Sequence, residues 1–141
     1  MQKQENNYFM SRDEMDKFLE SIGGLENGFY PDRPAIKKSD FFEIGSGWMG
    51  LVKQLIEDCI ALGWDKQICQ VKEKLGGLRF YINSASPEVF DKIREAENKS
   101  FEICVVTGLP GKLRSDLGWG ITLCDEEYEK RKRKKLEHGR I

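Results

Sequence analysis

The sequence has a single histidine, His138, and this scarcity excludes most sites whose chemistry depends on an imidazole. A histidine-activated serine or cysteine nucleophile needs its base within the folded core, whereas His138 lies in a basic segment late in the sequence. A glycine-rich phosphate loop is lacking as well, since Gly45-Ser46-Gly47 before an expected helix is only a short capping turn. We therefore predict that the protein is not an enzyme.

One catalytic alternative stays open, a metal-dependent nuclease built near an expected strand. Such a site needs a carboxylate two residues before a lysine, and Gln70 occupies that position ahead of Lys72. Asp65 and Glu73 would be its acidic residues. Because glutamine removes a charge that a divalent metal needs, we place this alternative behind non-catalytic binding.

Long apolar runs are absent too, since no stretch approaches the roughly 18 apolar residues that a membrane-spanning helix needs. The first seven residues are polar and lack the apolar centre of a signal peptide. The four cysteines do not form the dense pattern of a secreted, disulfide-rich protein. We expect a cytoplasmic protein with a heavily charged surface, because 33% of the 141 residues are charged although the net charge is only −1.

Helix and turn signals predict an α+β fold, in which helices combine with small antiparallel β-hairpins. We expect helices over residues 11–22, 48–62, 86–99 and 125–136, a hairpin over 67–82 that turns at Gly76-Gly77, and a second hairpin between Cys104 and Cys124. Residues 23–46 form a long, mostly irregular connection that a short strand at Phe41, Phe42 and Ile44 pins to the core. The segments 1–46, 47–99 and 100–141 are expected to form one compact unit.

The hairpin over 67–82 has one face that alternation predicts to be exposed. Lys72, Lys74, Arg79 and Tyr81 fall on this face and make a small cationic patch with one aromatic ring. Such a patch is suited to a phosphate or to an acidic partner. The alternative is an ordinary solvated sheet face.

Charge is also concentrated in the last expected helix, where acidic residues precede an unbroken basic run. The basic run consists of Lys130, Arg131, Lys132, Arg133, Lys134 and Lys135. Acids at the start of a helix and bases at its end match the helix dipole, so a solvated helix end explains the run as well as an anionic partner does. Just before this helix, Trp119 either stacks on a nucleic-acid base or anchors the hairpin core beside Leu113 and Leu117, and Arg114 either binds an anion or covers the hairpin.

Residues 100–127 have the layout of a zinc ribbon, with a ligand pair on a glycine-ended turn, a hairpin, and a second pair at the start of a helix. A structural zinc site needs four ligands, usually cysteines and histidines in two pairs whose members are three residues apart. Here the first pair is Cys104 with Thr107, and the second is Cys124 with Glu127. Half of the expected ligands are therefore missing.

The motifs occur in a specific order along the chain. Gly47-Trp48 is followed by Gln-Val-Lys-Glu-Lys-Leu-Gly-Gly-Leu-Arg-Phe-Tyr at 70–81, by Cys-Val-Val-Thr-Gly-Leu-Pro-Gly at 104–111, and by Gly-Trp-Gly-Ile-Thr-Leu-Cys-Asp-Glu-Glu at 118–127. This order and spacing resemble a family of uncharacterised small bacteriophage and prophage proteins, over about residues 44–127. The resemblance implies a phage or mobile-element origin, without implying an activity.

In that family the two ligand pairs look like a zinc site, and this chain leaves three alternatives. An open, weak zinc site would use Cys104, Cys124, Glu127 and a water; a metal-free ribbon would keep the two cysteines as close buried thiols; a disulfide would join them. A threonine hydroxyl is a poor zinc ligand, and cytosolic disulfides are uncommon. We therefore expect no cofactor and a metal-free, degenerate ribbon, with zinc as the alternative.

Taken together, the residues and the resemblance predict a small, non-enzymatic, phage-type protein that binds a host protein. Counter-defence or takeover of host machinery would be its biological context. The alternative is a nucleic-acid-binding accessory protein that uses the basic run together with the cations of the 67–82 hairpin.

Overall fold

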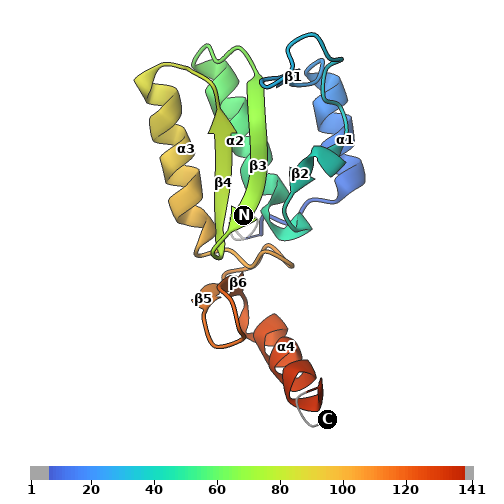
Figure 1. Cartoon of the computed structure of the whole chain (residues 1–141), viewed down its shortest axis with the longest axis vertical. Coiled ribbons are helices and arrows are strands. Elements are labelled where there is room, and N and C mark those ends of the chain that lie inside the picture. Colours follow the sequence, from blue (N-terminus) through green and yellow to red (C-terminus); the bar gives the residue numbers. More distant parts are fainter. Residues whose placement is uncertain (1–6, 139–141) are drawn as a thin grey trace.

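The computed structural model describes residues 7–138 and has the predicted α+β architecture (Figure 1). Its helices are α1 (Arg12–Ser21), η2 (Ser39–Phe41), η3 (Ser46–Trp48), α2 (Met49–Ala61), α3 (Pro87–Ser100) and α4 (Asp125–His138), of which η2 and η3 are short 3-10 turns. Its strands are β1 (Glu26–Asn27), β2 (Phe42–Glu43), β3 (Gln67–Lys74), β4 (Gly77–Ile82), β5 (Lys112–Arg114) and β6 (Ile121–Leu123). Within residues 7–138, no helix is both long and apolar enough to cross a membrane. The predictions for residues 1–6 and for the side chain of His138 lie outside the described part.

Local sequence signals start the helices where they are expected. The Ser11 hydroxyl accepts a hydrogen bond from Glu14 N at 3.1 Å, and the Glu14 carboxylate accepts one from Ser11 N at 2.9 Å, which completes a capping box at α1. Ser86 caps α3, whose first residue is Pro87. Cys59 on α2 is fully buried, as predicted, and burial raises the pKa of its thiol to about 11.

The larger sheet is built around β3 and is mixed. β4 pairs with β3 in the predicted antiparallel sense, whereas β1 and β2 both pair parallel with the other edge of β3, Phe42 lying opposite Val71. The short strand β2 is expected from the sequence, but neither β1 nor the parallel pairing is. A two-residue strand is too short to show an alternating pattern, and its partner is chosen by the path of the whole chain.

The β3–β4 turn lies one residue earlier than predicted. Leu75 and Gly76 are its two central residues, with φ of 55° and 87°, and Lys74 pairs with Gly77 across the turn. Two successive positive φ angles are what a type I′ hairpin requires. Glycine is needed at position 77 for a different reason, namely space. A Cβ atom at this position would lie 2.3 Å from the ring of Phe101.

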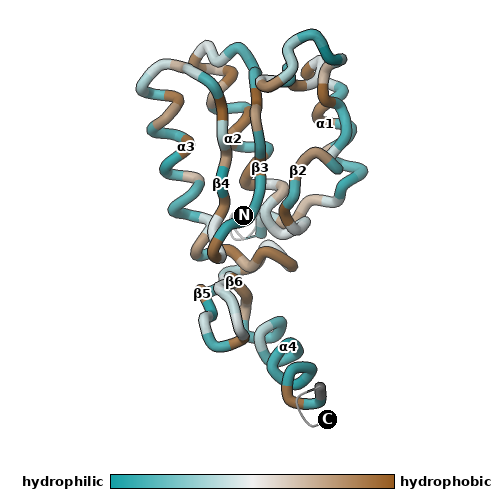
Figure 2. The backbone as a smooth tube through the Cα atoms, viewed as in Figure 1, coloured by the Kyte–Doolittle hydropathy of each residue, from teal (hydrophilic) through white to brown (hydrophobic). Residues whose placement is uncertain are grey.

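The helices α2 and α3 cover one face of this sheet and leave the other face open. The covered face carries Val71, Leu78 and Phe80, which are all buried. In Figure 1, β3 and β4 lie in front of α2, and no described helix crosses in front of them. Figure 2 shows that α4 is mostly hydrophilic and extends away from the sheet.

The N-terminal segment and the chain around residues 103–108 are both bonded to the rest of the molecule by long-range hydrogen bonds. Tyr8 N donates to Gly108 O at 2.9 Å. Trp48 is fully buried, and its indole Nε1 donates to Ile103 O at 2.8 Å. These long-range bonds hold the turn at residues 104–108 against the start of α2.

The outer edge of β4 is closed by side chains of α3. Ser100 Oγ accepts a hydrogen bond from Leu78 N at 2.9 Å, and Glu97 Oε2 accepts one from Phe80 N at 3.0 Å. Unpaired backbone groups on an edge strand attract other strands, and proteins commonly cover them. The two side chains therefore stabilise the sheet and protect its edge.

Replacing Glu97 with alanine is expected to lower the free energy of unfolding by about 1–3 kcal/mol, because the part-buried Phe80 N–H loses its acceptor. The matched control is Glu95→Ala on the same helix, since Glu95 is exposed and contacts Lys92 at 3.6 Å in a surface ion pair. This control should cost less than about 1 kcal/mol. Urea denaturation measures both values, and equal losses would contradict the edge-closing role of Glu97.

Candidate functional site on the open sheet face and the C-terminal module

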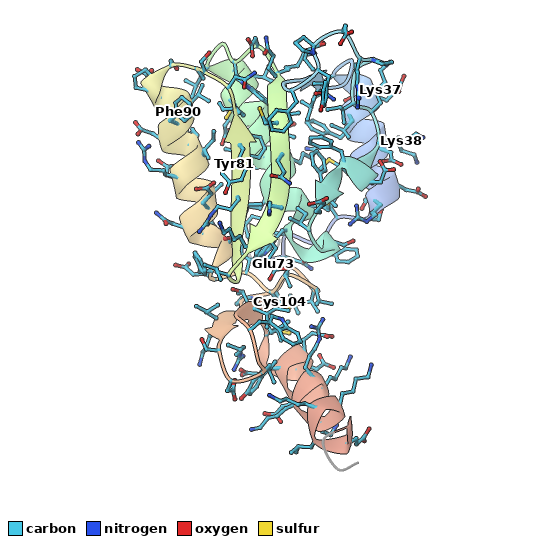
Figure 3. All side chains as sticks on the ribbon, in the orientation of Figure 1. Lys37, Lys38, Glu73, Tyr81, Phe90 and Cys104 are labelled. Atoms are coloured by element: carbon cyan, nitrogen blue, oxygen red, sulfur yellow. The ribbon has the colours of Figure 1, made fainter. Side chains whose placement is uncertain are left out.

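The outer face of β3 and β4 brings together the side chains that the sequence predicts as a cationic patch. Lys72 lies directly opposite Arg79 in the antiparallel register, and Tyr81 lies opposite Gln70. Lys74 follows Lys72 on the same face, because alternate residues of a strand share a face. We call these five residues the open-face patch; Figure 3 labels Tyr81, which is 40% exposed on β4.

The cations of the open-face patch have no carboxylate within ion-pair distance among residues 7–138. Arg79 Nη1 donates to Leu78 O at 3.1 Å, and Glu43 of β2 stands next to Lys72 in the parallel register as an exposed carboxylate. Like charges directly opposite each other destabilise a sheet. Lys72 facing Arg79 therefore costs stability that a bound anionic group would restore.

Arg114, a predicted anion or partner ligand, is used inside the C-terminal module, by which we mean residues 100–138. Its Nη2 atom donates to Asp125 Oδ1 at 2.8 Å and to Leu123 O at 3.0 Å, and its guanidinium lies 4.3 Å from the ring centre of Tyr128. The hydrogen bond and charge of Arg114 lower the pKa of Asp125. Arg114 thus joins β5 to the start of α4, which agrees with the alternative that it covers the hairpin.

Trp119 lies at the exposed end of the β5–β6 hairpin. Its side chain is 61% exposed, Leu113 is also exposed, and Leu117 is buried. The alternative in which Trp119 anchors the hairpin core is therefore wrong, because Leu117 takes that place. The indole is free to contact a partner.

The six residues of the basic run all lie on α4, which extends away from the rest of the molecule (Figure 1). Lys130 contacts Glu127 at 3.3 Å, and Lys132 lies 5.4 Å from the ring centre of Tyr128. Burial raises the pKa of Glu73 on β3, and the nearby charge of Arg131 opposes that rise. Lys132, Arg133, Lys134 and Lys135 are exposed.

Thr107 lies between the two cysteines of the degenerate ribbon. Thr107 N donates to Cys104 Sγ at 3.4 Å, and Thr107 Oγ1 donates to Cys124 Sγ at 3.7 Å. Burial alone would raise the pKa of Cys104, but hydrogen bonds from the Thr107 side chain and from backbone amides, including that of Cys124, lower it. A hydroxyl and backbone N–H groups therefore surround sulfur atoms that a metal would hold in a complete zinc ribbon.

The predicted zinc ligands do not form a set of three. Within residues 7–138, no group of three or more histidine, cysteine, aspartate or glutamate side chains is placed to hold a metal, and the Glu127 carboxylate contacts Lys130. Cys104 and Cys124 are free thiols. Two sulfur atoms and one neutral hydroxyl are too few ligands for a tetrahedral structural zinc site.

The acidic residues of the nuclease alternative lie at opposite ends of β3. Asp65 precedes the strand, where its carboxylate accepts a hydrogen bond from Gln67 N at 3.1 Å, and Glu73 lies near the last residue of the strand. At about 3.3 Å per residue, the backbone of β3 from Gln67 to Glu73 alone spans about 20 Å, and Asp65 precedes it. The two carboxylates do not converge on one metal ion.

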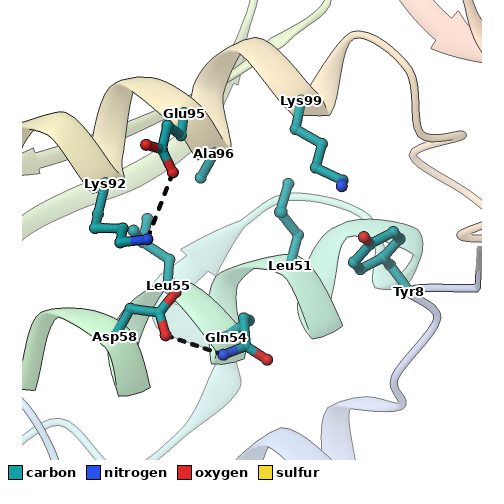
Figure 4. Close-up of a pocket in the computed structure, with 9 residues that line it drawn as sticks. All are labelled: Tyr8, Leu51, Gln54, Leu55, Asp58, Lys92, Glu95, Ala96 and Lys99. Carbon is teal, nitrogen blue, oxygen red and sulfur yellow. Dashed lines mark hydrogen bonds and ion pairs between the residues drawn. The ribbon is translucent and has the colours of Figure 1, made fainter. Parts of the chain in front are cut away.

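A cavity of about 150 Å³ lies between α2 and α3 beside Tyr8 (Figure 4). Four of its polar groups bind neighbours on their own helices, Lys92 contacting Glu95 at 3.6 Å and Gln54 donating to Asp58 at 3.0 Å, while Lys99 lies 5.6 Å from the ring centre of Tyr8. Sites that hold drug-sized ligands have volumes of roughly 300–1,000 Å³. We therefore assign no small-molecule site to this cavity.

Three features of the surface are missed by the sequence predictions. Glu43 lies beside the open-face patch through the parallel pairing of β2, for which the sequence has no local signal. The place of Gln70 on this face could be predicted from the sequence, because Gln70 is two residues before Lys72 on β3 and alternate residues of a strand share a face. The exposed side chains of Phe29 and Tyr30, with rings in edge contact 6.5 Å apart, come from the 23–46 connection, where adjacent aromatic residues were the available signal.

No family model, curated protein or solved structure matches this chain. Its function is therefore inferred from the chemistry of these surfaces.

Proposed function

We propose that this protein is a non-catalytic, phage-type binding protein that acts on an acidic surface of a host protein. The observation that supports this most directly is the pair formed by Lys72 and Arg79, which face each other on an uncovered sheet face with no carboxylate in ion-pair contact among the described residues. Carboxylates on a partner would relieve the repulsion between the two cations. Binding is then driven by partner carboxylates that contact two cations, Lys72 and Arg79, which face each other without such a contact in the free protein.

The composition of the open-face patch favours a protein partner over a nucleic acid. Glu43 lies beside Lys72, so the face presents both signs of charge, and a phosphate backbone would meet one unfavourable contact there. Tyrosine and arginine are among the residue types that most often dominate protein interfaces, and this face supplies Tyr81 and Arg79. We therefore expect a partner with two or more carboxylates opposite Lys72 and Arg79, and a basic group opposite Glu43.

Reversing the two central charges with Lys72→Glu/Arg79→Glu is expected to weaken partner binding by more than about 10-fold, because close charge pairs across an interface couple by about 1.5 kcal/mol or more. The fold should be kept, since both side chains lie on the outer face. The matched control is Lys17→Glu/Lys38→Glu, which makes the same change in net charge at exposed positions away from β3 and β4.

Affinity capture from a bacterial lysate with wild-type and both variant proteins identifies a partner that the wild type and the control retain and the open-face variant loses. Calorimetry with the purified partner then measures the three affinities. Equal binding by all three proteins would contradict the open-face patch as the site. Loss of the captured protein after nuclease treatment would show that nucleic acid bridged the contact.

A further inference from the structure

The last two turns of α4 carry positive charge that nearby groups do not neutralise. Beyond Lys130, the described helix has a single carboxylate, Glu137, against five further cations. Arg133 and Lys134 are exposed, and neither has a carboxylate within ion-pair distance among the described residues. This part of α4 therefore has a large excess of positive charge.

Several acidic groups near the start of α4 are already engaged within the module. Asp125 contacts Arg114 at 2.8 Å, and Glu127 contacts Lys130 at 3.3 Å. Asp116 accepts a hydrogen bond from the Tyr128 hydroxyl. These contacts reduce the repulsion that such carboxylates would exert on an anionic ligand, although Glu126 and Glu129 stay exposed on the first turns.

The loop that carries Trp119 contacts α4 at Tyr128 and at Lys135. Besides the Tyr128 contact, the backbone carbonyl of Asp116 accepts a hydrogen bond from Lys135 Nζ at 3.5 Å. The charges of Lys132 and Lys135 also help to lower the pKa of Asp116, after the larger effect of the Tyr128 hydrogen bond. Trp119 is three residues farther along this loop, so an exposed indole and the basic run occupy one end of the molecule.

We propose that Trp119 and the basic run of α4 form a binding site for single-stranded nucleic acid. One unpaired base stacks on the indole, and the phosphates contact Arg133, Lys134 and the neighbouring cations. This site is separate from the open-face patch. The protein therefore binds a nucleic acid in addition to its protein partner. It requires no bond to be made or broken.

A single strand fits these groups better than a duplex or an acidic protein surface does. Bases in a duplex are stacked on each other and cannot cover an indole, whereas unstacked bases can. Cations on consecutive helical residues point in several directions around α4, and a rigid partner surface can contact only one side of the helix. A flexible strand with one charge per nucleotide can follow them.

The test measures binding of the full chain to a fluorescein-labelled oligothymidylate by anisotropy at about 50 mM salt, with tryptophan fluorescence recorded in parallel. Three tryptophans are present, and Trp48 and Trp64 are buried, so quenching on binding reports Trp119. Trp119→Ala is expected to weaken binding about 10-fold, and Trp119→Phe should restore most of it. Arg133→Gln/Lys134→Gln should lower the slope of log K against log salt by about 1.4, or about 0.7 for each lost phosphate contact.

The matched control for the charge change is Lys17→Gln/Lys38→Gln, which should leave both the affinity and the salt slope unchanged. Absence of binding at low salt would overturn the proposal. So would equal affinity for a duplex of the same length, unchanged affinity of Trp119→Ala, or stronger binding of oligoglutamate or anionic vesicles than of the oligonucleotide. Lys72→Glu/Arg79→Glu distinguishes this site from the open-face patch, because it should keep the Trp119 quenching.

Discussion

Replacing Gly47 with alanine is expected to lower the free energy of unfolding by about 3 kcal/mol, at the upper end of the usual cost of overpacking, although it adds a single methyl group. The added Cβ would lie 2.2 Å from Cys104 O, 2.6 Å from Val105 C and 2.7 Å from Gly108 N. All three are backbone atoms of the turn at residues 104–108, so no change of side-chain rotamer can relieve the contact. The turn would have to move away from η3, which breaks the bond from Gly47 N to Val105 O.

The control for this prediction is Gly63→Ala at the end of α2. A Cβ at Gly63 meets no atom within 4 Å, and its φ of +93° makes the change cost only about 1–2 kcal/mol through backbone strain. Urea denaturation at equilibrium compares the two variants. A loss at Gly47 no greater than the loss at Gly63 would show that the turn and η3 are not in close contact in solution.

Completing the ligand pairs with Thr107→Cys/Glu127→His is expected to create a site for one zinc ion per chain. Thr107 Oγ1 is 3.7 Å from Cys124 Sγ, and bonds of about 2.3 Å in a tetrahedral site place two sulfur ligands about 3.8 Å apart. Position 127 lies on the first turn of α4, three residues after Cys124, which is the usual separation of a ligand pair. Only the side chains have to change, since the turn at Cys104 already directs backbone amides to its sulfur.

Native mass spectrometry should show one added zinc on the double variant, and the free energy of unfolding should rise by about 4 kcal/mol when free zinc is roughly 1,000-fold above its dissociation constant. Glu127→His alone supplies three strong ligands, and Thr107→Cys alone supplies three sulfur atoms with only the Glu127 carboxylate as a fourth ligand, so each single variant should bind zinc more weakly. Adding Cys104→Ser to the double variant should abolish the stabilisation. A double variant that stays free of zinc, or binds it without gaining stability, would show that the ribbon geometry has diverged. Native mass spectra of the wild-type protein test the weak zinc site that the sequence leaves as an alternative.

The parts of the fold that the sequence predicts correctly are those with local causes. Helix starts follow from capping residues such as Ser11 and Ser86, each of which bonds an amide only a few residues away. The β3–β4 hairpin follows from alternation over a short stretch, and only its turn is displaced by one residue. The open-face patch is predictable for the same reason, because Lys72 and Arg79 are close neighbours along a single hairpin.

The remaining features depend on groups that are distant in sequence, and there the tertiary structure decides. Glu43 lies beside Lys72 because β2 pairs parallel with β3, and this pairing follows from the long path of the 23–46 connection. Leu117, not Trp119, enters the core because the rest of the module determines which side of the hairpin is covered. Local sequence thus determined the helices and the hairpins, because their hydrogen bonds join residues that are close in the sequence. It also determined the order of charged residues along the chain. Which charges stay unpaired and which rings stay exposed was decided by packing between segments far apart in the chain, because burial is a property of all neighbours together.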